Sequence, residues 1–249
     1  MKKALSYPLT LLYYLCFGIT LSIFHGVQII CLRIFGYQAH KKSVDLLNWV
    51  VLRCLNLLGT RFILHDVPKL KRDFPIIIVA NHQSTYDIPP LIWNLRNCHP
   101  KFISKKELGK GIPSISYNLK YGGSVLIDRK DKAGSLESIK SFAQKVRENN
   151  WSVVIFAEGT RSRDGNPKSF QKGGLITLFN EIPNARLLPI SIGNSWQLSR
   201  FKYFPMPLGV SIVFKFHPLQ MIDSQQPKKS LESLQKIIHQ GVYEIQSKI

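Results

Sequence analysis

A stretch without charged side chains, from Ala4 to Leu32, is the feature that most limits what this chain can fold into. Leucine, isoleucine, phenylalanine and tyrosine dominate it, and it is long enough for a membrane-spanning helix. It is too long for a signal peptide, and no cleavage site of small residues follows it, so we expect a retained anchor. His25, Gly26 and Gln28 interrupt its apolar character, and basic residues flank both ends. The sequence therefore leaves open a full span or a helix embedded in one leaflet.

A second apolar segment, Ser43–Gly59, is predicted as a helix with Ser43 as N-cap and Gly59 as C-terminal stop. Its polar residues form a single stripe, which consists of Asp45, Asn48 and Arg53. This pattern fits a core helix, and it equally fits a helix that packs on the anchor at the membrane interface. We therefore predict membrane-associated helices in residues 1–59 and one α/β domain in residues 60–249.

From residue 75 onward, apolar runs typical of buried strands alternate with loops and amphipathic helices. The predicted strands are Pro75–Ala80, Lys101–Ser104, Ser124–Ile127, Ser152–Phe156, Leu187–Ile192 and Val210–Phe216. Helices are predicted at Ser135–Arg147, with Ser135 as its cap, and at Ser230–Ser247. Continuous apolar strands separated by helices indicate an α/β fold, with a mostly parallel or mixed sheet covered by helices on both faces.

The charge of the chain favours anionic partners. Lysine and arginine number 34 against 15 aspartates and glutamates, which gives a formal net charge of +19. The basic residues are scattered along the chain, as on a basic face of a folded body, so anionic lipids and phosphorylated molecules are candidate partners. A nucleic-acid-binding protein is a rival interpretation that rests on charge alone. The apolar first sixty residues do not support it, and we expect no nucleic-acid partner.

The four cysteines predict neither a disulfide framework nor a metal site. They are Cys16, Cys31, Cys54 and Cys98, and they include no Cys-x-x-Cys pair. As reduced, buried side chains they favour a reducing compartment. No close cluster of cysteine and histidine exists, and no phosphate-binding glycine loop is complete. We therefore expect no metal and no cofactor.

The predicted strand Pro75–Ala80 leads directly into Asn81 and His82, and Asp87 follows in the same loop. A histidine at the end of a buried strand, with a carboxylate near enough to hydrogen-bond its ring, makes an oriented general base near neutral pH. The alternative is a local structural hydrogen bond in a turn. Polar loops follow the other strands as well, and ligands of α/β folds gather at the carboxyl ends of strands.

Four blocks together resemble the glycerolipid acyltransferases typified by 1-acyl-sn-glycerol-3-phosphate (lysophosphatidate) acyltransferase. The His-x-x-x-x-Asp motif of that family matches His82 to Asp87, and its glycine-rich block before an arginine is similar to Gly122–Arg129. The block Phe-Pro-Glu-Gly-Thr-Arg is similar to Phe156–Arg161, and a hydrophobic stretch around a proline is similar to Leu188–Ile190. Ala157 stands where the third block of the family usually has proline. We therefore expect the rigidity of this loop to differ from that of the family.

The resemblance implies transfer of a fatty acyl group from acyl-CoA or acyl-carrier protein to the free hydroxyl of lysophosphatidate, giving phosphatidate for phospholipid biosynthesis. His82 is then the general base and Asp87 its orienting partner, without a covalent enzyme intermediate. Arg129 and Arg161 are the candidates to hold the acceptor phosphate by paired hydrogen bonds, and Lys105 adds positive charge.

The remaining residues of the third block are also expected to bind substrate. Glu158 either contacts the glycerol hydroxyl of the acceptor or pairs with an arginine. Gly159 and the backbone that follows it, at Thr160, are candidate donors to a tetrahedral oxyanion. We expect an enzyme at the inner (cytoplasmic) membrane with its site facing the cytoplasm. Another lyso-lipid acceptor and a catalytically dead membrane scaffold are the alternatives, and the acyl donor, its chain length and the oligomeric state stay open.

Overall fold

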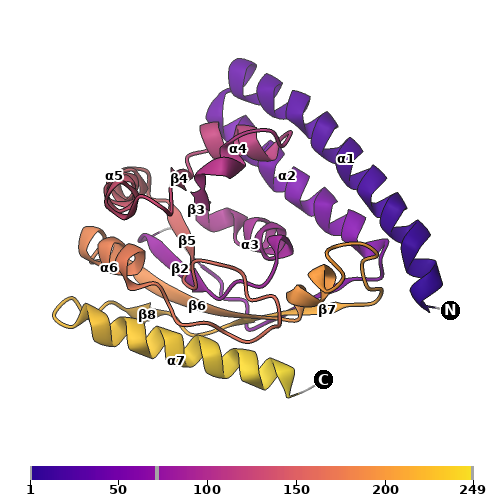
Figure 1. Ribbon diagram of the computed structural model, residues 1–249. Coiled ribbons are helices and arrows are strands. Elements are labelled where there is room, and N and C mark those ends of the chain that lie inside the picture. Colours follow the sequence, from indigo (N-terminus) through magenta and orange to yellow (C-terminus); the bar gives the residue numbers. More distant parts are fainter. Residues whose placement is uncertain (1, 71–72, 248–249) are drawn as a thin grey trace.

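The computed structural model describes residues 2–70 and 73–247 and contains one eight-stranded sheet between two layers of helices (Figure 1). The α/β fold with a mixed sheet covered on both faces, expected from the sequence, is confirmed. The strand order is β1-β7-β6-β2-β5-β3-β4, and β8 pairs with β6. The strands are β1 (Arg61–His65), β2 (Ile76–Ala80), β3 (Pro100–Lys105), β4 (Val125–Ile127), β5 (Ser152–Phe156), β6 (Arg186–Gly193), β7 (Ser211–Phe216) and β8 (Gln220–Met221).

Five neighbouring strands run in the same direction, and the sheet becomes mixed at one side only. β6, β2, β5, β3 and β4 are parallel. β7 runs antiparallel to β6 and carries β1 as a parallel edge strand. β2 lies at the centre with a parallel neighbour on each side, so the strand that leads into His82 is among the most enclosed in the sheet.

The two faces of the sheet bury two separate cores. On β2, Ile76, Ile78 and Ala80 point to one core and Ile77 and Val79 to the other, as expected from the alternation of side chains along a strand. The first face is covered by α2 (Gly36–Asn56) and α3 (Ile88–Asn94), with α4 (Ile115–Tyr121) beside them. The second is covered by α5 (Lys132–Asn149), α6 (Lys172–Glu181) and α7 (Pro227–Gln246). Short 3-10 helices are η1 (Thr85–Asp87), η2 (Arg96–Cys98), η3 (Lys106–Gly109) and η4 (Ser195–Ser199).

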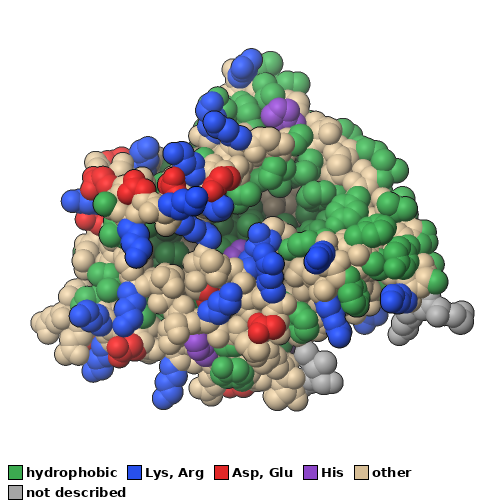
Figure 2. Space-filling view, in the orientation of Figure 1, with side chains coloured by type: hydrophobic (Ala, Val, Ile, Leu, Met, Phe, Trp, Pro, Cys, Tyr) green, Lys and Arg blue, Asp and Glu red, His purple; other side chains and the backbone are tan. Residues whose placement is uncertain are grey.

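The long helix α1 (Lys2–Ile34) lies beside α2 in an antiparallel pair at the surface (Figure 1). Gly36, at φ +78°, provides the left-handed backbone of the tight turn between them. By length and composition α1 could cross a membrane, and most of it is exposed. Figure 2 shows hydrophobic side chains gathered along this side of the molecule.

α2 begins seven residues before the helix start that the sequence predicts at Ser43. The helix begins at Gly36, and the hydroxyl of Ser43 donates to the carbonyl of His40 inside it, at 2.7 Å, so Ser43 is not an N-cap. The helix packs on both α1 and α3 and still exposes the apolar side chains of Leu46 and Trp49. Packing in the core and packing on α1 therefore both occur, on different sides of the helix, and its place at a membrane interface stays a prediction.

Two further boundaries also differ from prediction. α5 begins at Lys132, and its cap is Asp131, which accepts from the N–H of Gly134 at 2.9 Å. Ser135 instead donates to the carbonyl of Asp128 at 2.6 Å. α7 begins at Pro227, because proline fits the first turn of a helix. Strands β1 and β8 and helices α3, α4 and α6 were not predicted.

Candidate active site

The carboxyl ends of four neighbouring parallel strands carry the loops that the sequence singled out. Across the sheet these strands follow one another in the order β2, β5, β3 and β4. They lead, in the same order, into the loops of His82, Arg161, Lys105 and Arg129. The sheet thus brings segments from four separate parts of the chain to one edge, which is where α/β folds bind ligands.

His82 and Asp87 form a hydrogen-bonded pair at this edge. Nδ1 of His82 lies 2.8 Å from Oδ2 of Asp87. The same oxygen accepts from the backbone N–H groups of Gln83, at 2.8 Å, and Ser84, at 2.9 Å. Asp87 is fully buried, whereas 13% of the His82 side chain is exposed. An ionised carboxylate only accepts hydrogen bonds, so Nδ1 carries the proton and Nε2 is the basic nitrogen, able to take a proton from an approaching group.

The loop of His82 is held from three sides. The ring of Phe156 stacks on the imidazole, with centroids 4.0 Å apart and planes inclined by 15°. The backbone N–H of Ser162 donates to the carbonyl of His82 at 2.7 Å. The side-chain amide of Asn81 bonds both backbone groups of Ile192, at 2.8 and 2.7 Å. The imidazole is therefore held between β5 and β6 without any ligand.

Ala157, which stands in place of the usual proline, makes a hydrogen bond that proline cannot make. Its N–H donates to the carbonyl of Ala80 at 3.0 Å and so extends the pairing of β2 with β5. Its carbonyl accepts from Gln171 at 2.7 Å, and its side chain is buried. The departure from the family pattern thus ties together the two strands from which the loops of His82 and Arg161 emerge.

Glu158 lies beneath the loop of His82, and only 3% of it is exposed. Its Oε1 accepts from the N–H of Lys168 at 3.2 Å, and the backbone of His82 also hydrogen-bonds the carboxyl. Burial raises the pKa of Glu158 to about 7, while these two backbone groups oppose the shift. Among the described residues Glu158 forms no ion pair with an arginine, and its Oε2 is buried without a hydrogen-bond partner. Glu158 therefore joins two site loops.

Gly159 forms the turn after β5 at φ +71°, where an added Cβ would lie 2.9 Å from Cγ of Gln171. Its N–H donates to the carbonyl of Phe156 at 3.1 Å. In this conformation Gly159 is engaged in the turn, so an oxyanion would need donors from the backbone that follows. Thr160 is exposed, and its hydroxyl accepts from Nζ of Lys168 at 3.4 Å.

Positive charge surrounds the mouth of the site. Arg129 and Arg161 are exposed, and Figure 2 shows lysine and arginine side chains around a hollow in the centre of the view. Partial burial, with a further contribution from the positive charge of Arg161, lowers the pKa of Arg129 below its usual value, while Glu107 opposes the shift. Two guanidinium groups that repel each other favour an anion between them. Lys105 pairs with Glu107 at 2.8 Å, so its charge is partly neutralised.

Residues 61–193, more than half of the sequence, match the family model of the Acyltransferase family. This chain belongs to that family. The Acyltransferase match covers the loops of His82, Lys105, Arg129 and Arg161 together with the strands that carry them.

Several curated relatives of this acyltransferase are named 1-acyl-sn-glycerol-3-phosphate acyltransferase. The protein of Helicobacter pylori is 36% identical over 162 residues, which make up 63% of this chain and 58% of that protein. The protein of Cocos nucifera is 30% identical over 156 residues, or 61% of this chain and 48% of that protein. The chain thus spans about half the length of these relatives. The crystal structure of PlsC, the 1-acyl-sn-glycerophosphate acyltransferase of Thermotoga maritima, has the same fold, with a TM-score of 0.80, 22% identity and coverage of 99% of this chain and 98% of that one.

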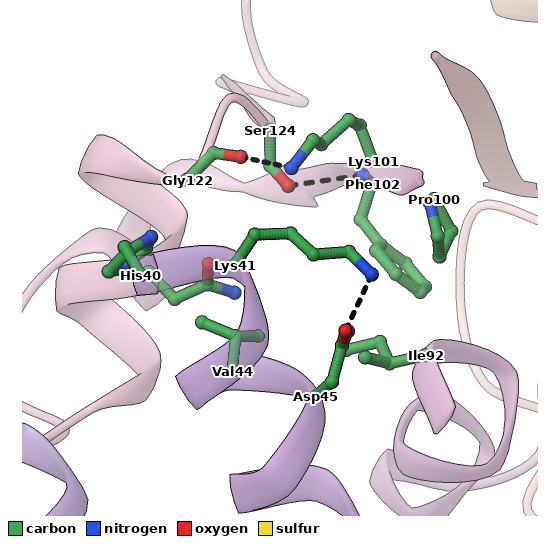
Figure 3. Close-up of a pocket in the computed structure, with 11 residues that line it drawn as sticks. His40, Lys41, Val44, Asp45, Ile92, Pro100, Lys101, Phe102, Gly122 and Ser124 are labelled. Carbon is green, nitrogen blue, oxygen red and sulfur yellow. Dashed lines mark hydrogen bonds and ion pairs between the residues drawn. The ribbon is translucent and has the colours of Figure 1, made fainter. Parts of the chain in front are cut away.

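The acyltransferase also contains a buried polar cluster that the sequence did not reveal, between α2 and β3 (Figure 3). Lys101 donates to the carbonyl of Gly122 at 2.5 Å, and Lys41 contacts Asp45 at 2.5 Å. Burial, and then the charge of Lys41, lowers the pKa of Lys101 to about 7, although Asp45 opposes the shift. His40 is fully buried, and burial followed by the charge of Lys101 lowers its pKa to about 4.

One aromatic layer separates this cluster from the base. Phe102 borders a small cavity in this cluster. Its ring lies 6.3 Å from the ring of Phe156, which stacks on His82. A lysine at the start of an apolar strand carries no sequence signal of burial, because lysines at strand ends are usually exposed. The burial of Lys101 depends on α2, whose residues lie beside it in the fold.

Tyrosines from α1 and from the segment between β6 and β7 also reach the site. Tyr13 of α1 is fully buried, and its hydroxyl donates to that of Tyr86, next to Asp87, at 2.9 Å. Nη1 of Arg161 donates to the hydroxyl of Tyr203 at 3.1 Å. Sequence reasoning missed Tyr13 and Tyr203, because these contacts join residues that are far apart in the chain.

Proposed function

We propose that this acyltransferase moves a fatty acyl group from a thioester donor, acyl-CoA or acyl-carrier protein, to the free hydroxyl of lysophosphatidate and so forms phosphatidate. The observation that carries the proposal is the position of the His82–Asp87 pair beside two exposed arginines at one sheet edge. An oriented base next to an anion-binding surface suits an acceptor that has both a hydroxyl and a phosphate. The names of the curated relatives support the same acceptor.

In the proposed reaction Nε2 of His82 takes the proton of the acceptor hydroxyl as its oxygen attacks the thioester carbonyl. Asp87, hydrogen-bonded to Nδ1, stabilises the imidazolium that forms. The tetrahedral intermediate then collapses, the carbon–sulfur bond breaks, and the thiolate receives the proton from His82. The products are the acylated acceptor and a free thiol, so neither an enzyme nucleophile nor a cofactor takes part. General-base catalysis of this kind accelerates a reaction about 10²- to 10⁴-fold.

Binding of the acceptor is assigned to the positive loops. Arg129 and Arg161 hold the phosphate, because a planar guanidinium donates paired hydrogen bonds that match phosphate oxygens. Lys105 adds charge at the same edge. Glu158 is assigned to the glycerol part of the acceptor, because its buried Oε2 has no hydrogen-bond partner within the protein. The backbone at Gly159 and Thr160 is assigned to the oxyanion once the turn opens to substrate.

We also propose that the enzyme lies on the cytoplasmic side of the membrane with α1 embedded in one leaflet. The inner face of α1 hydrogen-bonds other parts of the chain at positions from Thr10 to His25, about half of its length, and it also packs along α2. A helix that is attached sideways to a folded domain cannot cross the bilayer without taking the domain along. Its outer face exposes Leu5, Leu11, Leu15, Ile19, Ile23, Val27, Ile30 and Ile34, the pattern of a helix lying in the interface.

An acyl-transfer assay with the full chain in detergent or lipid vesicles tests the proposal. The panel contains lysophosphatidate and other lysophospholipids as acceptors, each offered with acyl-CoA and with acyl-carrier protein. We expect the highest kcat/KM with lysophosphatidate. Preference for another lyso-lipid would change the acceptor and keep the reaction, whereas folded protein that transfers to none from either donor would contradict the enzyme assignment.

A further inference from the structure

The segment between β6 and β7 holds a strained tyrosine at the mouth of the site. Lys202 and Tyr203 are consecutive non-glycine residues with positive φ, 52° and 66°. Side chains other than glycine rarely adopt this backbone, so the surrounding contacts must maintain it. The consequence of the strained geometry is that the hydroxyl of Tyr203 meets Nη1 of Arg161 at 3.1 Å.

Contacts with α1 keep Tyr203 in this place. The hydroxyl of Tyr14 donates to the carbonyl of Tyr203 at 2.8 Å. Further along the segment, the N–H of Met206 donates to the hydroxyl of Thr10 at 2.9 Å. The ring of Tyr203 also lies edge-on to Tyr86, with centroids 6.2 Å apart. The membrane-facing helix therefore clamps the segment that touches Arg161.

Arg161 needs such a support because its side chain is exposed and long. A free arginine samples many rotamers, and binding an anion then costs the entropy of choosing one of them. A hydrogen bond from one guanidinium nitrogen to Tyr203 selects the rotamer and leaves the other N–H groups free for an anion. Tyr203 accepts this hydrogen bond without introducing a negative charge, so the positive charge of Arg161 stays available.

We propose that Tyr203 is a positioning residue that aims the guanidinium of Arg161 at the phosphate of the acyl acceptor, and that α1 holds Tyr203 through Tyr14. The inference rests on the proposed function, because it takes the phosphate-bearing acceptor as the ligand of Arg161. It adds a link between the membrane helix and the capture of substrate. Tyr203 thus acts in recognition of the phosphate and takes no part in the proton transfer at His82.

The variant Tyr203→Phe tests the proposal because it removes the hydroxyl and keeps the ring. We expect KM for lysophosphatidate to rise about three- to tenfold with kcat little changed, as for the loss of one ordinary hydrogen bond at an exposed position. With 1-acylglycerol, which lacks the phosphate, the variant and the natural sequence should have the same kcat/KM. Tyr243→Phe, at an exposed tyrosine of α7, is the matched control and should leave all constants unchanged.

A second variant and a direct binding measurement complete the test. Tyr14→Phe should raise KM for lysophosphatidate in the same direction by a smaller factor, because Tyr203 then loses one support. In an Arg161→Met background, Tyr203→Phe should have no further effect, since the donor of the hydrogen bond is already absent. Calorimetric titration with glycerol 3-phosphate should show a weaker Kd for Tyr203→Phe, by the same factor as KM.

Two outcomes would overturn the inference and leave the proposed function intact: an unchanged KM in Tyr203→Phe, or an equal fall of kcat with both acceptors, which indicates only a structural role. If the natural sequence transferred no acyl group to any acceptor, the proposed function would fail instead. The titration would then still decide the matter, because equal Kd values for glycerol 3-phosphate would refute a role of Tyr203 in aiming Arg161.

Discussion

At the scale of single residues, one oxygen of Asp87 receives three hydrogen bonds, and only one of them comes from His82. The other two come from the backbone of the same loop, so the carboxylate fixes the loop and the imidazole together. Without these two donors the carboxylate would hold neither the loop nor the imidazole in its present place. The orientation of His82 thus depends on the fold of its own loop as much as on Asp87.

His82→Ala should lower turnover about 10²- to 10⁴-fold while the chain keeps its fold and its binding to vesicles, because only the base is removed. The measurements are acyl transfer to lysophosphatidate and sedimentation with vesicles. His65→Ala, at an exposed histidine on the edge strand β1, is the matched control and should transfer normally. Turnover that survives His82→Ala would show that another group takes the proton.

Glu158→Gln should change how stability depends on pH. The pKa of Glu158 is raised to about 7 in the folded chain from an ordinary 4.5, so the folded state binds the proton more tightly. Its stabilising contribution is complete below pH 4.5 and is lost as pH rises through 7. The variant does not titrate, so its Tm relative to the natural sequence should rise between pH 5 and pH 8. A difference in Tm independent of pH would mean that the carboxyl is already ionised at pH 5.

At the scale of elements, α1 is both the helix that we propose to bind the membrane and a wall of the site. Its outer face is apolar and exposed, whereas Thr10, Tyr13 and Tyr14 on other sides bond the segments that surround His82 and Arg161. Tyr13 and Phe17 also pack in the core that α2 and α3 share with the sheet. The two roles belong to different faces, and substitutions can therefore separate them.

Removal of residues 1–35 should abolish attachment to vesicles, and it should also abolish turnover in detergent, because Tyr86 and Tyr203 lose their supports. Acyl transfer in micelles and vesicle flotation measure the two effects. Leu11→Gln combined with Leu15→Gln, on the exposed face, is the control that should weaken flotation and keep turnover in micelles. A truncated chain that is fully active in detergent would show that α1 serves only for attachment.

Much of the element pattern was predictable, and the errors have physical causes. Strands β2, β5 and β6 were placed within a residue or two, because both of their faces are buried and they read as continuous apolar runs. The start of α2 was missed because polar residues precede Ser43, yet they form a regular helix beginning at Gly36. Helix α6 escaped notice because Gly173 and Gly174 lie in its first turn, where glycine disfavours a helix.

At the scale of the whole molecule, the sequence predicts where the site loops lie along the chain. It does not predict which of these loops lie next to each other at the edge of the sheet. The His82–Asp87 contact is local and follows from a spacing of five residues. The proximity of Arg129 to Arg161 depends on β4 joining β3 and β3 joining β5, and periodicity carries no information about such pairing. The contacts of Tyr203 and Lys101 depend in the same way on helices packed over the sheet.

The net charge of +19 and the exposed apolar face of α1 predict that membrane binding has an electrostatic component and a hydrophobic component. Binding to vesicles that contain anionic lipid should be stronger than to neutral vesicles, because basic side chains near the surface are attracted to the lipid charge. Raising the salt from about 0.05 to about 0.5 M should remove this difference by screening and leave a residual affinity. Flotation assays at both salt concentrations measure the binding to each kind of vesicle. Complete release at high salt would contradict insertion of α1.

The contacts between α1 and the segment before β7 also govern when the enzyme can become active during its synthesis. Thr10 bonds Met206 across 196 residues, and Tyr14 bonds Tyr203 across 189. α1 is synthesised before the segment that holds Tyr203, and it can pack on α2 well before its contacts with that segment form. An early meeting of α1 with lipid would shelter its apolar face from aggregation during that interval. The contacts of Thr10 and Tyr14 are thus among the last to form, and the support of Arg161 is completed late in folding.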